Sequence, residues 1–121
     1  MKTSIMLEVE NVGKTYSAPG GDFIALQGVS FTAQAGEIPA IVGRSGSGKS
    51  TLLNMLTGID HPTQGFVRLM GRDIHRLNES ELSVFRGANI GIVFQFNQLI
   101  PTLTILENIL IAMDFVNKIP R

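Results

Sequence analysis

The sequence predicts an α/β fold in which an antiparallel pair of strands accompanies a strand, loop and helix unit. Two early segments alternate apolar and polar residues, and a glycine-rich loop separates an apolar run from a helical pattern. A second apolar run follows further along the chain. The 121 residues, 44% of them hydrophobic, suffice for one core, so we expect one domain over residues 1–121.

The first two predicted strands show the alternation of a half-buried sheet. They cover residues 5–9 and residues 23–33, and turn-forming residues 18–22 lie between them. An antiparallel pair is therefore expected. The predicted inward-facing residues are Ile5, Leu7, Val9, Leu26, Val29 and Phe31.

Two continuous apolar runs, residues 38–42 and 90–94, are typical of strands buried on both faces of a parallel sheet. Pro39 is unfavourable there, because proline removes a hydrogen-bond donor from the strand. Residues 65–70 are predicted to form a further short strand.

Three helices are predicted from apolar spacing and from capping residues. The first covers residues 50–57 and ends at Gly58, and the second begins after Asn78. Thr104 and Glu107 form the sequence pattern of a capping box for the third. In the first helix, the apolar residues at helical spacing are Leu52, Leu53 and Leu56. The third helix is expected to have one apolar face, formed by Ile105, Leu106, Ile109, Leu110 and Met113.

The glycine-rich loop matches the phosphate-binding pattern G-x-x-x-x-G-K-[ST] in full, between a predicted strand and a helix. Its glycines let successive backbone N–H groups point at an anion, and the helix adds the positive end of its dipole. Lys49 would contact the β and γ phosphates and Ser50 would bind Mg²⁺, with Thr51 beside them at the helix start. The predicted nucleotide-binding residues of the loop are Gly43, Arg44, Ser45, Gly46, Ser47, Gly48, Lys49, Ser50 and Thr51.

This loop does not identify the reaction, because kinases, GTPases and transport ATPases share it. The alternative is an ordinary Gly/Ser loop that contains a lysine.

Composition excludes several other functions. Lys plus Arg equals Asp plus Glu at 10 each, so the net charge does not favour nucleic acid or an anionic membrane as a partner. The absence of cysteine excludes disulfides and thiolate metal sites.

Residues 1–9 do not resemble an export signal, and no segment has the roughly 20 apolar residues that cross a bilayer. Any membrane association is expected to depend on a partner.

The remaining charged and titratable residues give no separate site. His61 and His75 lie in polar surroundings without a carboxylate or cysteine at metal-ligand spacing, so both are expected to be solvated. The basic residues Arg68, Arg72, Arg76 and Arg86 alternate with acidic ones, which favours a solvated face over a nucleic-acid surface.

Several segments in a shared order resemble an ABC-transporter ATP-binding protein. They are residues 12–16 with Tyr16, residues 26–31, the loop, residues 65–74 and residues 90–95. Residues 97–109 are most similar to the subgroup that serves macrolide export and lipoprotein release. The resemblance covers the whole chain, and it implies a P-loop NTPase fold of the ABC type.

The resemblance also implies roles for individual residues and partners. Tyr16 would stack on adenine, and Gln95 would contact Mg²⁺ and the attacking water, so that Lys49 and Gln95 are the catalytic candidates and Ser50 and Gln95 the metal ligands. The alternative for Tyr16 is a structural role at the rim of the core, and the alternative for Gln95 is a glutamine in a surface loop. Both alternatives stay open. Residues 96–106 would receive a membrane-spanning subunit, or else complete the core of this chain.

The family's Walker B strand, signature motif, D-loop and switch histidine are not found in the sequence. We therefore expect the N-terminal portion of an ATP-binding domain, with an incomplete parallel sheet and no hydrolysis by this chain alone. Unpaired strands would make the chain marginally stable or prone to self-association.

The complete protein would bind ATP and Mg²⁺, form a dimer of ATP-binding subunits, and lie in the cytoplasm at the inner face of the membrane through transporter subunits. One alternative interpretation is a truncated, non-catalytic protein that only binds a nucleotide or a transporter subunit. Another is a small P-loop kinase.

Overall fold

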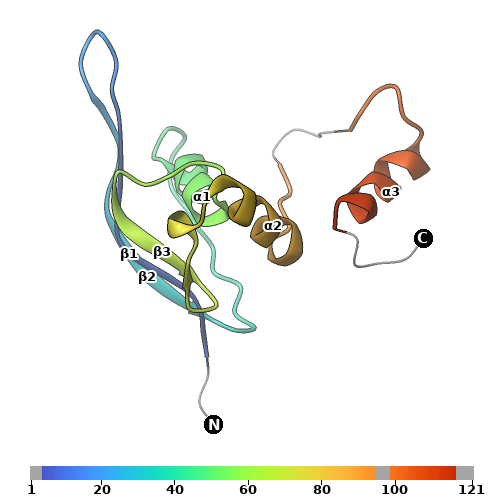
Figure 1. The fold of residues 1–121 in the computed structure, drawn as a ribbon. Coiled ribbons are helices and arrows are strands. Elements are labelled where there is room, and N and C mark those ends of the chain that lie inside the picture. Colours follow the sequence, from blue (N-terminus) through green and yellow to red (C-terminus); the bar gives the residue numbers. More distant parts are fainter. Residues whose placement is uncertain (1–3, 95–98, 117–121) are drawn as a thin grey trace. The chain divides into compact units, whose positions relative to one another are not determined.

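The computed structural model describes residues 4–94 and 99–116 (Figure 1). Contacts divide the chain into two units, Met1–Leu82 and Ser83–Arg121. The first unit contains the sheet and the glycine-rich loop, and the second contains most of α2 and all of α3. Among the described residues, no helix combines the length and apolar character needed to span a bilayer.

The first unit is organised around a four-stranded antiparallel sheet with the order β2-β1-β3-β4. Its strands are β1 (Ile5–Tyr16), β2 (Phe23–Gln34), β3 (Gln64–Leu69) and β4 (Arg72–Asp73). Pairing of β1 with β2 confirms the predicted antiparallel pair, and β3 confirms the predicted strand at residues 65–70. β1 runs further than alternation alone predicts, to Tyr16. Figure 1 shows β1 and β2 as a long paired ribbon beside β3.

The core of this unit lies where the sheet meets α1 (Lys49–Thr57) and the short 3-10 helix η1 (Ile74–Arg76). Its fully buried side chains are Val12, Val67, Met55, Ile74 and Leu82. Val9 and Leu26 are also buried, as predicted, whereas Ile5 is exposed near the start of β1. In α1 the buried residues are Leu52 and Met55, whereas Leu53 faces outward and is 49% exposed.

Neither of the two runs predicted as buried strands forms a strand. Residues 38–42 and 90–94 contain no strand residues, and the side chains of Ile38, Val42 and Val93 are 96%, 86% and 100% exposed. A strand buried on both faces needs a hydrogen-bonded neighbour on each side. Within the described residues no strand pairs with either run, so these apolar side chains remain uncovered.

The structure confirms the predicted end of the first helix and the predicted start of the second. α1 ends at Gly58, which has a left-handed backbone with φ of 80°. α2 (Glu79–Asn89) begins with a reciprocal capping box, in which Glu81 N donates to Asn78 Oδ1 and Asn78 N donates to Glu81 Oε1.

The third helix, α3 (Ile105–Val116), also begins with the predicted capping box. Thr104 N donates to Glu107 Oε1 at 3.0 Å, and Glu107 N donates to Thr104 Oγ1 at 3.1 Å. The hydrogen bond from the Thr104 N–H to the carboxylate, together with an interaction with the Thr104 side chain, lowers the pKa of Glu107. The apolar residues Ile105, Leu106 and Ile109 are exposed, and the side chain of Met113 lies outside the described residues.

Candidate phosphate-binding site

The predicted phosphate-binding loop has the backbone that an anion site requires. Gly46 and Gly48 have left-handed backbones with φ of 80° and 96°, and Gly48 is the N-cap residue of α1. No side chain among the described residues caps this helix end by a hydrogen bond. The free N–H groups of the first turn and the positive end of the helix dipole are therefore directed to the space above the loop.

Glycine is also required by the space around the loop. An added Cβ at Gly43 would lie 2.5 Å from Ser47 Oγ, and one at Gly48 would lie 2.7 Å from the carbonyl oxygen of Ala25. A Cβ at Gly46 would meet nothing within 4 Å. The loop is thus packed closely against β2 on one side and open at Gly46, which fits a cradle for a phosphate chain.

Lys49 closes the loop in this structure, because its ammonium group donates to the carbonyl oxygen of Gly43. Lys49 is half-buried, whereas Ser50 is exposed next to it at the start of α1. A phosphate oxygen is a stronger acceptor for an ammonium group than a neutral carbonyl. The loop therefore has a cation in place that can turn toward a nucleotide, and a hydroxyl beside it that is able to bind a metal ion.

Tyr16 lies at the end of β1, and its hydroxyl donates to Asp60 Oδ2 at 3.0 Å. Lys14 Nζ lies 5.0 Å from the ring centroid of Tyr16 and 3.2 Å from Asp60 Oδ1. Burial and the interaction with Asp60 raise the pKa of Tyr16, while a hydrogen bond with the Thr51 side chain lowers it. The fold thus brings Tyr16 next to Thr51, the last residue of the predicted loop set.

Asp60 is a residue that the sequence analysis missed. Burial alone would raise the pKa of this carboxyl group, but hydrogen bonds from His61 N, the Tyr16 hydroxyl and Lys14 Nζ outweigh burial and lower it. Asp60 follows α1 in a turn, and nothing in its local sequence distinguishes it from a solvated aspartate. The Asp60 carboxylate thus links the Tyr16 hydroxyl with the Lys14 ammonium group.

The two histidines are not both solvated, so that prediction is wrong for His75. His75 is half-buried, and its Nε2 lies 2.9 Å from the carbonyl oxygen of Met55. Its Nδ1 lies 2.9 Å from Nδ1 of His61, 14 positions earlier in the chain. Burial lowers the pKa of His75.

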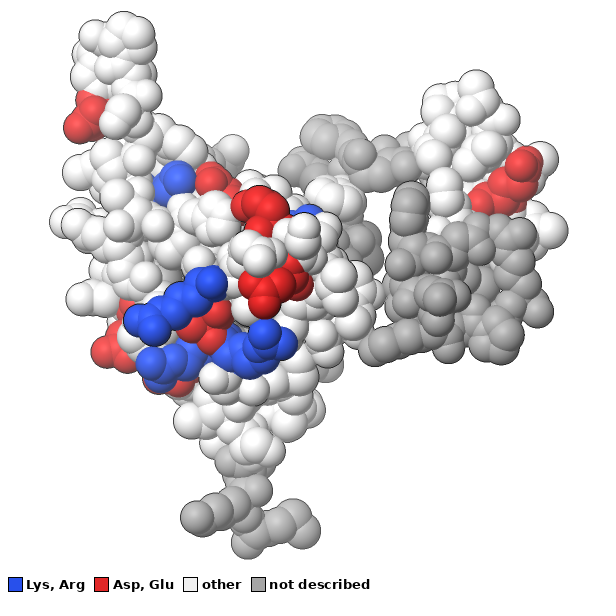
Figure 2. Space-filling view, in the orientation of Figure 1, with Lys and Arg blue, Asp and Glu red and all other residues white. Residues whose placement is uncertain are grey.

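The basic face of the first unit carries mixed charges, as predicted. Arg68 lies over the ring of Phe66 at 4.2 Å and 3.5 Å from Glu8 Oε2, and Arg76 lies 3.5 Å from Asp73. Figure 2 shows blue and red groups side by side on this face. Each pair is partly exposed, so it contributes little to stability.

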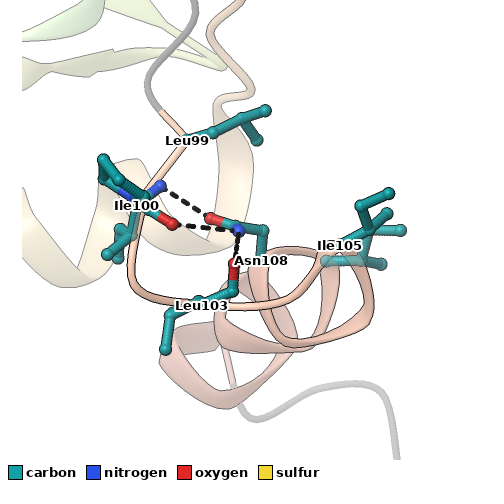
Figure 3. Close-up of a pocket in the computed structure, with 7 residues that line it drawn as sticks. Leu99, Ile100, Leu103, Ile105 and Asn108 are labelled. Atoms are coloured by element: carbon teal, nitrogen blue, oxygen red, sulfur yellow. Dashed lines mark hydrogen bonds between the residues drawn. The ribbon is translucent and has the colours of Figure 1, made fainter.

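In the second unit, apolar residues surround a hollow of about 280 Å³ between the chain before α3 and its first turns (Figure 3). The lining residues are Leu99, Ile100, Pro101, Leu103, Ile105, Asn108 and Ile109. All of them except Asn108 and Ile109 belong to residues 96–106, the segment predicted to receive a membrane subunit. Gln95 and residues 96–98 lie outside the described residues.

Asn108 holds the loop at this hollow. Its Oδ1 accepts from Ile100 N at 2.8 Å, and its Nδ2 donates to the carbonyl oxygens of Ile100, Leu103 and Thr104. An asparagine side chain that bonds both N–H and C=O groups of a loop replaces the partners that a strand would provide.

We expect Asn108→Ala to increase the hydrogen-exchange rate of the Ile100 amide about tenfold, because the substitution removes the acceptor of that N–H. Amide exchange measured by NMR tests this. Asn89→Ala is the matched control, since Asn89 Nδ2 donates to Phe85 O within α2. Unchanged exchange at Ile100 in Asn108→Ala would show that the loop is held by other contacts.

Comparisons with known proteins agree on one family. Residues 26–119 match the family described as ABC transporter. The lipoprotein-releasing system ATP-binding protein LolD of Nitratidesulfovibrio vulgaris is 44% identical over 104 residues, which are 86% of this chain and 45% of that protein. The bacitracin export ATP-binding protein BceA of Halalkalibacterium halodurans is 40% identical over 116 residues, 96% of this chain and 46% of that protein.

Solved structures give the same result. The dimeric structure of MJ0796, a bacterial ABC transporter cassette, matches with a TM-score of 0.89 at 39% identity, over 96% of this chain and 50% of that one. A post-hydrolysis state of the same cassette with bound ADP and Pi has the same TM-score. The chain spans about half the length of the relatives that it matches.

Proposed function

Because the chain belongs to the ABC transporter family, we propose that residues 1–121 are part of an ATP-binding domain whose glycine-rich loop binds Mg-ATP. The observation that carries this proposal is the loop itself. Two left-handed glycines, an uncapped helix N-terminus and the ammonium group of Lys49 meet at one place. That combination suits a triphosphate, because it presents N–H donors and a point charge to several oxygens at once.

In this proposal the residues of the loop, 43–51, surround the phosphates, and Lys49 contacts the β and γ groups. The Ser50 hydroxyl and Gln95 hold Mg²⁺, and Gln95 also orients the attacking water through its amide, which can both donate and accept. Mg²⁺ would supply charge neutralisation on the phosphates. The exposed position of Ser50 at the first turn of α1 supports its part of this assignment.

Tyr16 is proposed to stack on adenine. Its ring is 39% exposed, its hydroxyl is held by Asp60, and it lies next to Thr51 at the end of the loop. A ring held at its far end presents its face without further loss of side-chain entropy. The base would have to share that ring with Lys14, whose ammonium lies 5.0 Å from the centroid.

We expect Tyr16→Ala to weaken Mg-ATP binding about tenfold, because stacking of a base on an aromatic ring contributes about 1–3 kcal/mol. Tyr16→Phe is the control that keeps the ring and removes the hydrogen bond to Asp60, and we expect it to change affinity by less than about threefold. Calorimetric titration measures both. Equal losses in the two variants would mean that the hydroxyl, and not the ring face, matters for binding.

The proposed partners are membrane-spanning transporter subunits and a second ATP-binding subunit. The family match and the dimeric cassette structures support this proposal, and the relatives named for lipoprotein release and bacitracin export are described as ATP-binding proteins of such systems. Residues 96–106 would receive the membrane subunit, since Leu99, Ile100 and Ile105 of this segment line the hollow and are exposed. The protein would then lie in the cytoplasm at the inner face of the membrane.

ATP hydrolysis coupled to transport is proposed for the complete protein, and nucleotide binding without turnover for these 121 residues alone. The sequence contains no apolar run that ends in an acidic pair, so the aspartate that usually assists Mg²⁺ and the general base are not provided. The domain assignment is accordingly a partial one, with the nucleotide-binding loop in place and the signature motif absent from the sequence.

A titration of the purified chain with Mg-ATP, followed by an assay for released phosphate, tests the proposal. Saturable binding at one site without phosphate release is the expected result. Phosphate release above background would contradict the non-catalytic part of the proposal. Failure to bind would show that the loop does not act as a nucleotide site in this chain.

A further inference from the structure

A cluster of polar side chains lies apart from the glycine-rich loop, in the turn after α1 and around η1. His61 Nδ1 and His75 Nδ1 face each other at 2.9 Å, and the rings are inclined at 73°. The second nitrogen of each ring has its own partner. His75 Nε2 lies 2.9 Å from Met55 O, and His61 Nε2 lies 3.4 Å from Glu79 Oε1.

These outer partners bear on where the ring protons lie. The Met55 carbonyl can only accept, so His75 Nε2 donates its N–H, and the longer contact with the exposed Glu79 carboxylate favours a proton on His61 Nε2. A neutral imidazole with a proton on Nε2 has a bare lone pair on Nδ1. The two Nδ1 lone pairs would then face each other at 2.9 Å, and either a proton on one Nδ1 or a metal ion bound by both nitrogens would remove their repulsion.

We propose that His61 Nδ1 and His75 Nδ1 form a binding site for a divalent transition-metal ion of the Ni²⁺ or Zn²⁺ class. Metal–nitrogen bonds of about 2.0–2.1 Å at a right angle place two imidazole nitrogens about 2.9 Å apart, which is the separation seen here. The right angle is the one that octahedral Ni²⁺ prefers. A tetrahedral ion needs only a few tenths of an ångström more.

The outer contacts support a metal site independently of that distance. Histidines that bind metals donate their other ring N–H to a backbone carbonyl or a carboxylate, which fixes the ring and its tautomer. His75 has the carbonyl of Met55 in this position, and His61 has Glu79. These contacts at Nε2 orient both rings, so that the two Nδ1 atoms can bind the same metal ion.

The surroundings have room for the remaining ligands. A hollow of about 530 Å³ includes both histidines, Asp73 and Arg76 in its lining. The positive charge of Arg76 is paired with Asp73 at 3.5 Å, so it does not face the histidines alone. Among the described residues no third His, Cys, Asp or Glu joins the pair as a ligand, and water would complete the coordination. The site is therefore open, and the metal exchangeable.

Calorimetric titration of the nucleotide-free chain with Ni²⁺ alone tests the proposal. We expect one site in the wild type, and at least tenfold weaker binding in His61→Gln and in His75→Gln. Glu79→Gln should weaken binding by about tenfold at most, since Glu79 orients a ligand and is not one. Glu37→Gln, a carboxylate change in the turn after β2, is the control and should leave the affinity unchanged.

A thermal readout distinguishes the folded site from binding to an unfolded chain. Ni²⁺ should raise the unfolding temperature of the wild type and of Glu37→Gln, and not that of His61→Gln. His61 is exposed in the turn after α1, so this variant keeps the fold even if His75→Gln loses it. Equal Ni²⁺ affinity in wild type and His61→Gln, or no binding by the wild type at millimolar Ni²⁺, would overturn the proposal.

Discussion

Gly65→Ala is expected to lower the free energy of unfolding by about 3–5 kcal/mol, because the added methyl group would collide with the backbone of β1. Gly65 has φ of 79°, and an added Cβ would lie 2.4 Å from both the carbonyl carbon and oxygen of Asn11. The obstacle is backbone in β1, so no side-chain rotation relieves it. The ladder between β1 and β3 would have to separate at the register shift after Glu10.

Gly71→Ala is the matched control for this substitution. Gly71 also has φ of 79°, but an added Cβ there would meet nothing within 4 Å. It should cost only the strain of a left-handed alanine, about 1–2 kcal/mol. Urea denaturation of the two variants separates strain from collision. Equal losses would show that the contact between Gly65 and Asn11 does not limit the packing of the sheet.

Lys49→Ala is expected to weaken Mg-ATP binding about 100-fold, which corresponds to about 2.7 kcal/mol. The ammonium group now bonded to Gly43 O is the point charge that the loop holds over the proposed phosphate position. Its removal leaves the N–H groups of the loop in place, so the backbone cradle is retained while the charge-assisted bonds to phosphate are lost.

Arg44→Ala controls for general electrostatic attraction, because it removes an exposed cation of the same loop and keeps the loop backbone that is proposed to surround the phosphates. Its affinity for Mg-ATP should stay within about threefold of the wild type. Lys49→Arg keeps the charge but has a wider, planar head, and we expect intermediate affinity. Calorimetry on the three variants is the measurement. Similar losses for Arg44→Ala and Lys49→Ala would mean that the nucleotide is attracted by charge alone, without a specific bond from Lys49.

Local features of the fold could be predicted from sequence because their causes lie within a few residues. The glycines at positions 46 and 48, the end of α1 at Gly58 and the capping box at Thr104 each depend on neighbours in the chain. The antiparallel pair followed from alternation over two adjacent segments. The candidate phosphate site was predictable in the same way, since its loop and helix start form one continuous stretch.

Residues 38–42 and 90–94 show that an apolar sequence pattern alone is insufficient to predict a strand. An apolar run indicates that a segment is suited to burial, but only hydrogen-bonded neighbours decide whether it becomes a strand. Residues 38–42 and 90–94 have no such neighbour among the described residues, and all of their side chains except those of Ile41 and Ile90 are exposed.

The sequence by itself determined the glycine-rich loop, the capped helices and the family resemblance that the comparisons confirm. Only the tertiary structure brought Asp60 to Tyr16, paired His61 with His75 and placed Gly65 against Asn11. The reason is physical. Each of these contacts joins residues that lie far apart along the chain, and their distance depends on how β1, α1 and β3 pack together, which no short sequence pattern records.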